Sequence, residues 1–408
     1  MKKIAAFVTS ALICILVIGL FHLKFSGDLK MNNKEFGTWY NPFKDLASGV
    51  VAQNLHDDTM VVFGSSEFRH GRKTLYHPMN MFRNQNISLM TLGGPYNQTL
   101  NHATMLGAIA PKIKTKKVVL ILSPSWFYKN GVSEDHFGLR FSESAYINFM
   151  ENPNISKGTK RYVAARTLKL LSKSGSIEGR IARTNRINID GSKNIFSETA
   201  YKIRKRYLRD KDILTVKGVL KTEKIKRLDK YNGHIENAKP LNWDKVLEEA
   251  KVNGKFKSNN RFYIKTKDWN LKFRHRFKVA KGIHKNETYL ESPEYDDLKA
   301  FLRVCNAHGI KPLLVIQAVN GKWYDYTGLT RDKRKIFTTK INEIAAEYDA
   351  KVEDFSKYNY KKNFLVDASH PAAPGWVKID EAIYNYYKEN YRENTLFSRL
   401  FLSGFHNL

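Results

Sequence analysis

Two short stretches of the chain carry residue types that together can perform nucleophilic catalysis. VVFGSSEFRH, residues 61–70, runs from an apolar segment into a glycine and two serines, and NFLVDASHPAAPGW, residues 363–376, holds Asp367 and His370 three positions apart. A serine hydroxyl is inert near neutral pH unless a base, held by a third group, takes its proton. On one helical turn, residues at this spacing meet, so the carboxylate can orient the imidazole. The pattern predicts a nucleophilic serine with a His–Asp partner.

Both stretches also have a structural interpretation, which stays open at this level. Gly-Ser-Ser is a common strand-to-helix cap, Asp367 is a suitable cap for a final helix, and a single histidine is more often a satisfied core residue than a catalyst. The order of the parts favours chemistry. The serines follow a first strand, and ligands of open α/β sheets lie beyond the carboxyl ends of strands. Gly64 permits a sharp turn there, and Pro371 keeps His370 out of a helix.

The elements that must hold these residues alternate at both ends of the chain. Apolar runs predict strands at 60–63, 87–92, 117–122, 313–316 and 351–354. Helical spacing predicts helices at 97–111, 293–308, 331–348 and from 375. This alternation predicts an α/β fold with one doubly wound, mostly parallel sheet, built from residues 57–139 and 291–395.

A different region, about residues 140–290, lies between these two halves. From 201 to 232 it holds twelve Lys or Arg against four acids. We predict a mainly helical insertion with a basic face. That face either guides an anionic ligand or is only a solvated surface.

Charge and the first residues limit the class of partner. The 408 residues carry a net charge of +30, which favours polyanions. The stretch from Ile4 to Leu23 has no charged Lys, Arg, Asp or Glu and spans roughly 30 Å as a helix. With no cleavage site after it, we expect residues 1–24 to be an uncleaved membrane anchor and residues 25–408 an extracytoplasmic domain. Nucleic acid is then not an expected partner.

Cysteine and histidine patterns argue against two further classes of site. The two cysteines are Cys14, inside the apolar stretch, and Cys305, at a core position of a predicted helix, so we expect no intrachain disulfide. The twelve histidines form no H-x-H or H-x-x-x-H pair, so we expect no metal site.

As a set, these motifs are similar to those of the SGNH (GDSL-like) hydrolases. Within that group, the chain resembles the DltD family of Gram-positive envelopes. The matching stretches are the amino-terminal anchor, FGSSEF (63–68), LGGPYNQTL (92–100), ILSPSWF (121–127), VIQAVNGKWYDYTG (315–328) and DASHP (367–371).

The resemblance implies roles for individual residues. Ser66 matches the nucleophile, Asp367 the orienting acid and His370 the base, while Ser65 takes the place of the usual acid of the first block. The oxyanion hole should use the amide of Ser66 and that of Gly93 or Gly94. The substrate-binding residues expected around this centre are Ser65, Ser125, Trp126, Asn320, Trp323 and Tyr326.

Two features depart from the pattern or have a second interpretation. SGNH enzymes usually supply an asparagine after the third strand, whereas this chain reads Ser123-Pro124-Ser125-Trp126 there, and Asn97 and Gln98 are the only substitutes we can name. The hole is therefore expected to be less complete than in a free-standing esterase. The aromatic residues of 315–328 either line the site or are buried structural residues.

The implied activity is transfer of D-alanine esters to teichoic acids, lipoteichoic acid included, outside the membrane. The expected partners are a membrane-bound O-acyltransferase of the same pathway, the polymeric acceptor and, as a further candidate, the D-alanyl carrier protein. No cofactor is expected. Two alternatives stay open: a hydrolytic esterase or thioesterase with the same residues, and a non-catalytic scaffold that binds teichoic acid or the acyltransferase.

Overall fold

A five-stranded parallel sheet forms the centre of the protein. The structure is a computed structural model that describes residues 2–25, 27–192 and 194–389. The strands run in the order β2-β1-β3-β4-β5, and each neighbouring pair is parallel. Their bounds are β1 Thr59–Phe63, β2 Ser88–Leu92, β3 Lys117–Leu122, β4 Lys311–Ile316 and β5 Lys351–Asp354. The predicted α/β class and parallel sheet are confirmed. The predicted core ended at 395, and residues 390 onward lie outside the described residues.

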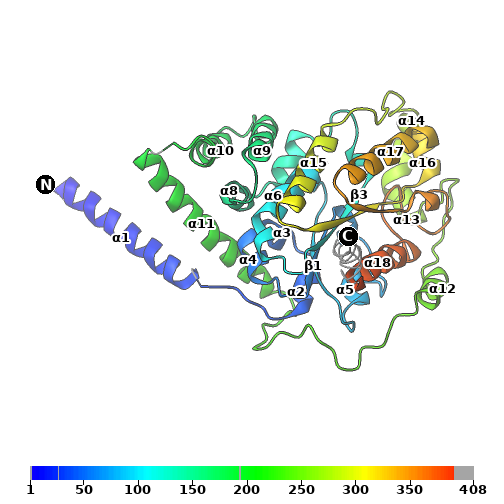
Figure 1. The fold of residues 1–408 in the computed structure, drawn as a ribbon, viewed down its shortest axis with the longest axis horizontal. Coiled ribbons are helices and arrows are strands. Elements are labelled where there is room, and N and C mark those ends of the chain that lie inside the picture. The colour runs from blue at the N-terminus through cyan, green and yellow to red at the C-terminus, as the bar shows by residue number, and fades with distance from the viewer. Residues whose placement is uncertain (1, 26, 193, 390–408) are drawn as a thin grey trace, which may run out of the picture.

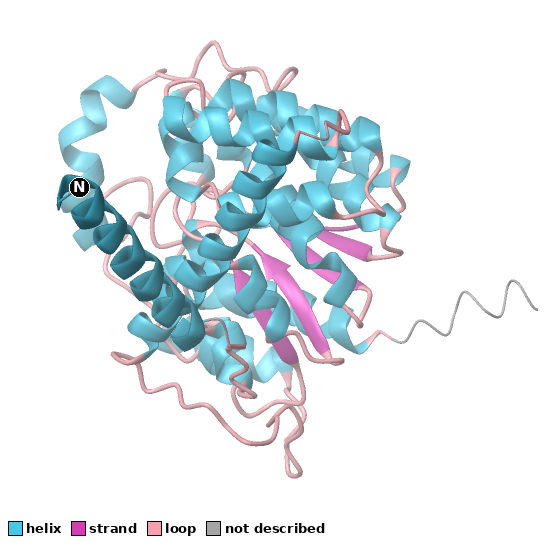
Figure 2. Ribbon diagram, turned by 90° about the vertical axis from the view of Figure 1, so that its left-hand side faces the viewer, coloured by secondary structure: helices cyan, strands magenta, loops and turns pink. Residues whose placement is uncertain are grey.

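Helices surround this sheet (Figure 2). Before β3 they are α1 (Lys2–Phe25), α2 (Lys34–Thr38), α3 (Pro42–Leu46), α4 (Ser48–Gln53), α5 (Pro78–Met81) and α6 (Thr99–Ile109). Between β3 and β4 they are α7 (Glu134–Arg140), α8 (Glu143–Glu151), α9 (Lys157–Leu170), α10 (Gly175–Asn188), α11 (Ile195–Leu220), α12 (Trp243–Asn253), α13 (Thr266–Asp268), α14 (Phe277–Ala280) and α15 (Pro293–Ala307). After β4 come α16 (Gly321–Thr327), α17 (Arg331–Glu347) and α18 (Ala373–Lys388).

Strands β1 to β4 are almost entirely buried on both faces, which explains their largely apolar sequences. The edge strand β5 is mostly polar, and its residues are half-buried or exposed. Because side chains alternate along a strand, Val61 and Phe63 enter one core with α6, α8, α15 and α17. Met60 and Val62 enter the other core, with α12 and α18. Figure 1 shows α6 and α15 on one side of the strands and α12 and α18 on the other.

The long segment between β3 and β4 contains helices and loops, and no strand lies within its described residues. Its most basic part, residues 201–232, is helical only as far as Leu220, where α11 ends, and residues 221–242 contain no helix. Apolar residues become sparse there, so a longer helix would have little apolar surface to bury.

Helix α1 is long and apolar enough to cross a membrane, and its apolar stretch is not buried against the rest of the chain. It contacts α11, and the two helices lie side by side at one end of the molecule (Figure 1).

Candidate active site

Ser66 lies directly beyond the carboxyl end of β1. The strand ends at Phe63, and a 3-10 turn over Ser66–Arg69 follows two residues later. Gly64 makes this turn possible, because a Cβ at this position would lie 2.2 Å from Glu67 Oε1 and 2.7 Å from the Phe68 ring. Any larger residue would push the serine turn away from the sheet.

Asp367 and His370 meet in a tight loop, not on a helical turn as the sequence suggested. Asp367 Oδ1 accepts hydrogen bonds from the amides of Ser369 and His370 at 3.0 and 2.9 Å. The Val366 amide donates to the His370 carbonyl at 2.9 Å and closes the loop. The aspartate therefore shapes the backbone that carries the histidine as well as contacting its ring.

Three side chains from opposite ends of the chain form one hydrogen-bonded series. Ser66 Oγ lies 2.8 Å from His370 Nε2. His370 Nδ1 lies 2.8 Å from Asp367 Oδ2. Because the carboxylate accepts the Nδ1 proton, Nε2 is the nitrogen left to accept the hydroxyl proton.

The charges of this series favour an ionised aspartate beside a basic imidazole. Asp367 is only 3% exposed, and burial opposes its charge. Burial is outweighed by the charge of His370 and by hydrogen bonds from the His370 ring and from the amides of Ser369 and His370. The pKa of Asp367 therefore lies below its usual range. Burial likewise opposes a charge on His370, but Asp367 raises the pKa of the imidazole above its ordinary value.

A second histidine, which the sequence analysis did not single out, stacks on the first. The rings of His70 and His370 lie 3.6 Å apart between centroids and are inclined by 16°. Burial and the neighbouring charge of His370 lower the pKa of His70 to about 4, so it is neutral at physiological pH. Its only sequence signal was its place at the end of VVFGSSEFRH.

The adjacent serines have different surroundings. Ser65 is buried, and its hydroxyl donates to the Gly94 carbonyl at 3.1 Å. Its amide donates to Glu67 Oε1 at 2.6 Å. Ser66, which is half-buried, is the serine that faces His370. The structure thus gives Ser65 a bridging position between the ends of β1 and β2, where the sequence analysis expected a substrate contact.

The two glycines expected at the oxyanion hole also differ in their surroundings, because one of their amides is already hydrogen-bonded within the protein. The Gly93 amide donates to Asp45 Oδ2 at 3.2 Å, so it has a partner within the protein. A Cβ on Gly93 would lie 2.3 Å from the Gly64 carbonyl oxygen, so only glycine allows the ends of β1 and β2 to approach this closely. The amides of Gly94 and Ser66 are the donors that stay candidates for an oxyanion hole. The side-chain oxygens of Asn97 and Gln98 are buried without a partner among the described residues.

The end of β4 supports the loop that carries the histidine. Gln317 Nε2 donates to the Ser369 carbonyl at 2.6 Å, and the Asn320 amide donates to the Ala368 carbonyl at 2.8 Å. The Asn320 side chain donates to the Phe262 carbonyl at 2.8 Å and caps α16. Asn320 therefore positions the loop, and Gln317 is a second positioning residue that the sequence analysis missed.

The remaining predicted substrate residues are largely engaged in packing. Trp323 packs edge-on against Phe262, with ring centroids 5.1 Å apart, and the Tyr326 hydroxyl donates to the Phe277 carbonyl at 2.9 Å. Trp126 is buried. Ser125 is half-exposed, with its hydroxyl 2.9 Å from that of Ser123.

The ligand atoms of His70, Asp367 and His370 lie within 4.8 Å of one another, which is close enough to hold a metal ion. In this arrangement His370 Nδ1 is hydrogen-bonded to Asp367 and Nε2 to Ser66, and His70 is stacked on the His370 ring, so these contacts account for the cluster without a metal ion. The absence of a metal site stays a prediction.

Fold and site together define an α/β protein with a Ser–His–Asp hydrogen-bonded series at the carboxyl edge of a parallel sheet. The chain belongs to the DltD family, whose model, described as DltD protein, matches residues 38–388.

Named relatives match nearly the whole chain. Protein DltD of Bacillus subtilis (strain 168) is 29% identical over 361 residues, covering 87% of this chain and 89% of the relative. Protein DltD of Staphylococcus aureus (strain NCTC 8325 / PS 47) is 27% identical over 358 residues, covering 84% and 85%. Protein DltD of Lacticaseibacillus rhamnosus is 24% identical over 353 residues, covering 84% and 81%.

Proposed function

We propose that this protein is a membrane-anchored serine acyltransferase that transfers D-alanine esters to teichoic acids outside the cell. Membership of the DltD family supports a role in teichoic acid D-alanylation. The observation that carries the enzymatic part is the hydrogen-bonded series of Ser66, His370 and Asp367, with its two bonds of 2.8 Å.

The chemistry follows from the positions of the three side chains. Ser66 Oγ attacks the acyl carbonyl of the donor while His370 Nε2 takes the hydroxyl proton, and Asp367 stabilises the imidazolium that forms. The donor's thiol or alcohol leaves with that proton, and a D-alanyl ester stays on Ser66. An acceptor hydroxyl of the polymer then gives its proton to His370 and attacks this ester. Ser66 regains its proton as the product departs.

Amides around the serine supply the charge stabilisation. The negative oxygen of each tetrahedral intermediate would face the amides of Ser66 and Gly94, since Gly93 is bonded to Asp45. The residues directly after β3, Ser123 to Trp126, include no asparagine, so fewer donors are expected than in a free-standing esterase. A weaker hole slows attack by water and by a hydroxyl alike, so we infer that a polymer hydroxyl is preferred over water because it is bound close to the ester.

Cations near the site suit a phosphate-rich acceptor. The charges of Lys272 and Arg69 act on His70, and Arg140 lies against Gly94, where a Cβ would be 3.0 Å from its guanidinium. Together with the net charge of +30, they favour an anionic polymer at the site.

The same proposal assigns a location and partners. Helix α1 anchors the chain, the domain from residue 25 faces outward, and the acyl group reaches Ser66 by way of a membrane-bound O-acyltransferase. The D-alanyl carrier protein is the further candidate donor.

The alternatives differ in product and in dependence on Ser66. A hydrolytic esterase or thioesterase would release free D-alanine, whereas the transferase yields D-alanylated polymer. A scaffold without chemistry would keep its function in a folded Ser66→Ala variant. Measuring polymer-bound and free D-alanine with the unaltered chain and with Ser66→Ala separates all three.

A further inference from the structure

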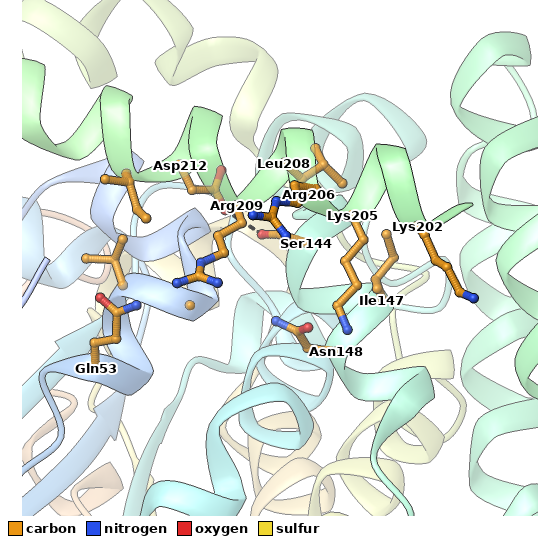
Figure 3. Close-up of a pocket in the computed structure, with 13 residues that line it drawn as sticks. Gln53, Ser144, Ile147, Asn148, Lys202, Lys205, Arg206, Leu208, Arg209 and Asp212 are labelled. Carbon is orange, nitrogen blue, oxygen red and sulfur yellow. Dashed lines mark hydrogen bonds between the residues drawn. The ribbon is translucent and has the colours of Figure 1, made fainter. Parts of the chain in front are cut away.

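A groove away from the serine has an apolar floor and a cationic rim. It lies between α4, α8 and α11 and has a volume of about 310 Å³ (Figure 3). Buried apolar side chains line its floor: Val50, Ile147, Leu208 and Ile213. Cations of α11 line its rim: Lys202, Lys205, Arg206 and Arg209. In Figure 3, Lys205 and Arg209 extend from α11 toward Asn148 and Gln53. Such a site suits a ligand that is both apolar and anionic.

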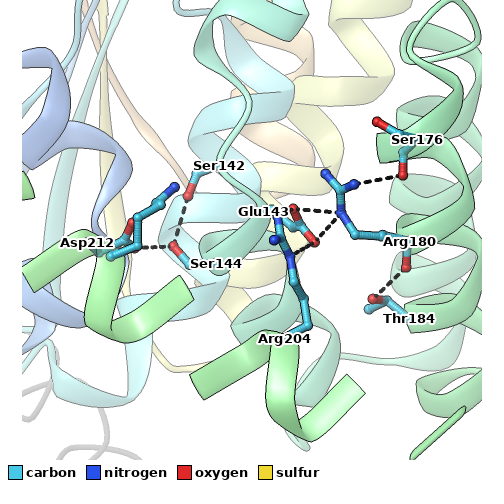
Figure 4. A network of polar contacts seen from close by, with 9 residues as sticks. Ser142, Glu143, Ser144, Ser176, Arg180, Thr184, Arg204 and Asp212 are labelled. Atoms are coloured by element: carbon cyan, nitrogen blue, oxygen red, sulfur yellow. Dashed lines mark hydrogen bonds and ion pairs between the residues drawn. The ribbon is translucent and has the colours of Figure 1, made fainter. Parts of the chain in front are cut away.

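Arg204, on the same helix α11, differs from these rim cations because it is engaged in polar contacts behind the groove. Glu143 accepts hydrogen bonds from Arg180 at 3.0 Å and from Arg204 at 2.6 Å, which ties α8, α10 and α11 together (Figure 4). Arg204 is therefore part of the framework. On the rim, Lys205 pairs with Glu151, and Lys202 forms no ion pair with any side chain that the structure describes.

The groove lies beside the end of the apolar helix α1. His22, in the last turn of α1, contacts both Asp210 and Arg206 of α11. Asp28, just beyond α1, lies 3.3 Å from Arg209. These contacts place the rim cations at the level where α1 leaves its apolar stretch.

A neighbouring face of α11 carries exposed apolar side chains. Phe196, Ile203 and Tyr207 are 83%, 66% and 50% exposed, and their spacing puts them on one side of the helix. A helix with such a stripe beside lysines and arginines is typical of a membrane surface.

We infer that this groove binds one anionic glycerophospholipid of the surrounding membrane. The phosphodiester headgroup would lie among Lys202, Lys205 and Arg206, and part of an acyl chain would cover Val50 and Ile147. A phosphate polymer shares the headgroup chemistry but has no acyl chain for the apolar floor. The inference rests on the proposed membrane attachment of α1. It adds a lipid site that would fix how the domain stands on the bilayer.

Two kinds of variant test the two halves of the site. Lys202→Glu with Lys205→Glu reverses the rim charge, with Lys221→Glu and Lys224→Glu, on exposed lysines outside the groove, as the charge-matched control. Gly49→Leu fills the groove without changing charge, since a Cβ at Gly49, a lining residue in α4, has no atom within 4 Å. The Gly49→Leu protein should still form helix α4, because leucine has a higher helix propensity than glycine.

The measurement is native mass spectrometry of the full chain in detergent with added phosphatidylglycerol. Phosphatidylcholine with the same acyl chains and a glycerol phosphate polymer without acyl chains are the comparison ligands. We expect the unaltered chain to prefer phosphatidylglycerol over phosphatidylcholine. The rim variant should lose on the order of ten-fold in affinity for phosphatidylglycerol, Gly49→Leu should also weaken it, and the control should not.

Equal binding of the two lipids, or binding unchanged in both the rim variant and Gly49→Leu, would overturn the inference. The ligand would instead be the polymer if polymer binding depended on the rim lysines but not on Gly49, and if lipid did not compete with it. Acylation of Ser66 is measured in a separate experiment, in which the same proteins turn over with the membrane-bound D-alanylation system. If the unaltered chain binds no phosphatidylglycerol but Ser66 is acylated normally, only the lipid site is refuted. If the unaltered chain binds phosphatidylglycerol selectively but Ser66 is not acylated, only the proposed chemistry is refuted.

Discussion

The two adjacent serines give the sharpest test of the site, because the structure assigns them different tasks. Ser66→Ala removes the hydroxyl that lies 2.8 Å from His370 Nε2. Since no other hydroxyl takes its place in the series, turnover should fall on the order of 10⁴-fold or more. Ser65→Ala removes the hydroxyl that donates to the Gly94 carbonyl at 3.1 Å.

The expected cost of the Ser65 change is structural and small. A buried hydrogen bond contributes about 1 kcal/mol, and a carbonyl left without its partner costs about 1–3 kcal/mol. A domain of this size tolerates such a loss, so Ser65→Ala should fold and keep substantial activity. The modest fall in its midpoint of thermal unfolding should be measurable by calorimetry or circular dichroism.

The assay compares D-alanyl ester content of teichoic acid in cells whose only copy of the protein is the unaltered chain, Ser66→Ala or Ser65→Ala. Each variant is first shown to be folded and present at equal amounts. Loss of activity in a folded Ser65→Ala protein, with Ser66→Ala active, would move the nucleophile by one residue and refute the geometric assignment. Normal D-alanylation with both variants would refute the serine mechanism.

Four further outcomes are expected. His370→Ala should match the loss of Ser66→Ala, and the double variant should be little worse than either single one, whereas additive losses in kcat would contradict a triad acting as a unit. His370 must be neutral to act as a base, and Asp367 raises its pKa above the ordinary value of 6.5, so kcat/KM should rise with pH through a midpoint above 6.5. Asp367→Asn should lower that midpoint. An unchanged midpoint would contradict the pairing of Asp367 with His370. His70→Phe, which keeps a stacked ring, should retain most activity, while His70→Ala should lose up to about ten-fold in kcat, as expected from a ring contact of about 0.5–1.5 kcal/mol; equal activity of the two would remove the positioning role. Protease added to intact cells should digest the domain beyond residue 30, and full protection would refute the proposed outward orientation.

Most of the sheet was predictable because four of its five strands, β1 to β4, are buried on both faces. KKVVLIL before Ser123 and LLVI at 313–316 are unbroken apolar runs, and such runs between helices leave few other arrangements. The end of α11 at Leu220 was less predictable, because the basic residues continue beyond it. Charge alone does not show where apolar side chains cease to pack against the protein. Helices α2, α3 and α4 are five or six residues long, too short for periodicity to reveal.

The candidate site was predictable only where chemistry restricts the residue type. A serine after a strand and an Asp-x-x-His before the last helix are recognisable in sequence, and the structure brings them within hydrogen-bonding distance. The stacking of His70 and the hydrogen bond from Gln317 to the histidine loop depend on tertiary contacts across 300 and 52 positions of chain, respectively. No local pattern encodes such contacts. The bond between Gly93 and Asp45 was hidden for the same reason.

The most direct test of the account is to trap the acyl group on the protein itself. The full chain is allowed to turn over with the membrane-bound D-alanylation system, quenched in acid, digested and analysed by mass spectrometry. We expect a D-alanyl ester on the peptide that contains Gly64-Ser65-Ser66, located on Ser66 by fragmentation. We also expect accumulation of that ester when the polymeric acceptor is withheld. An acyl group on any other residue, or full D-alanylation of teichoic acid by a folded Ser66→Ala protein, would contradict this expectation.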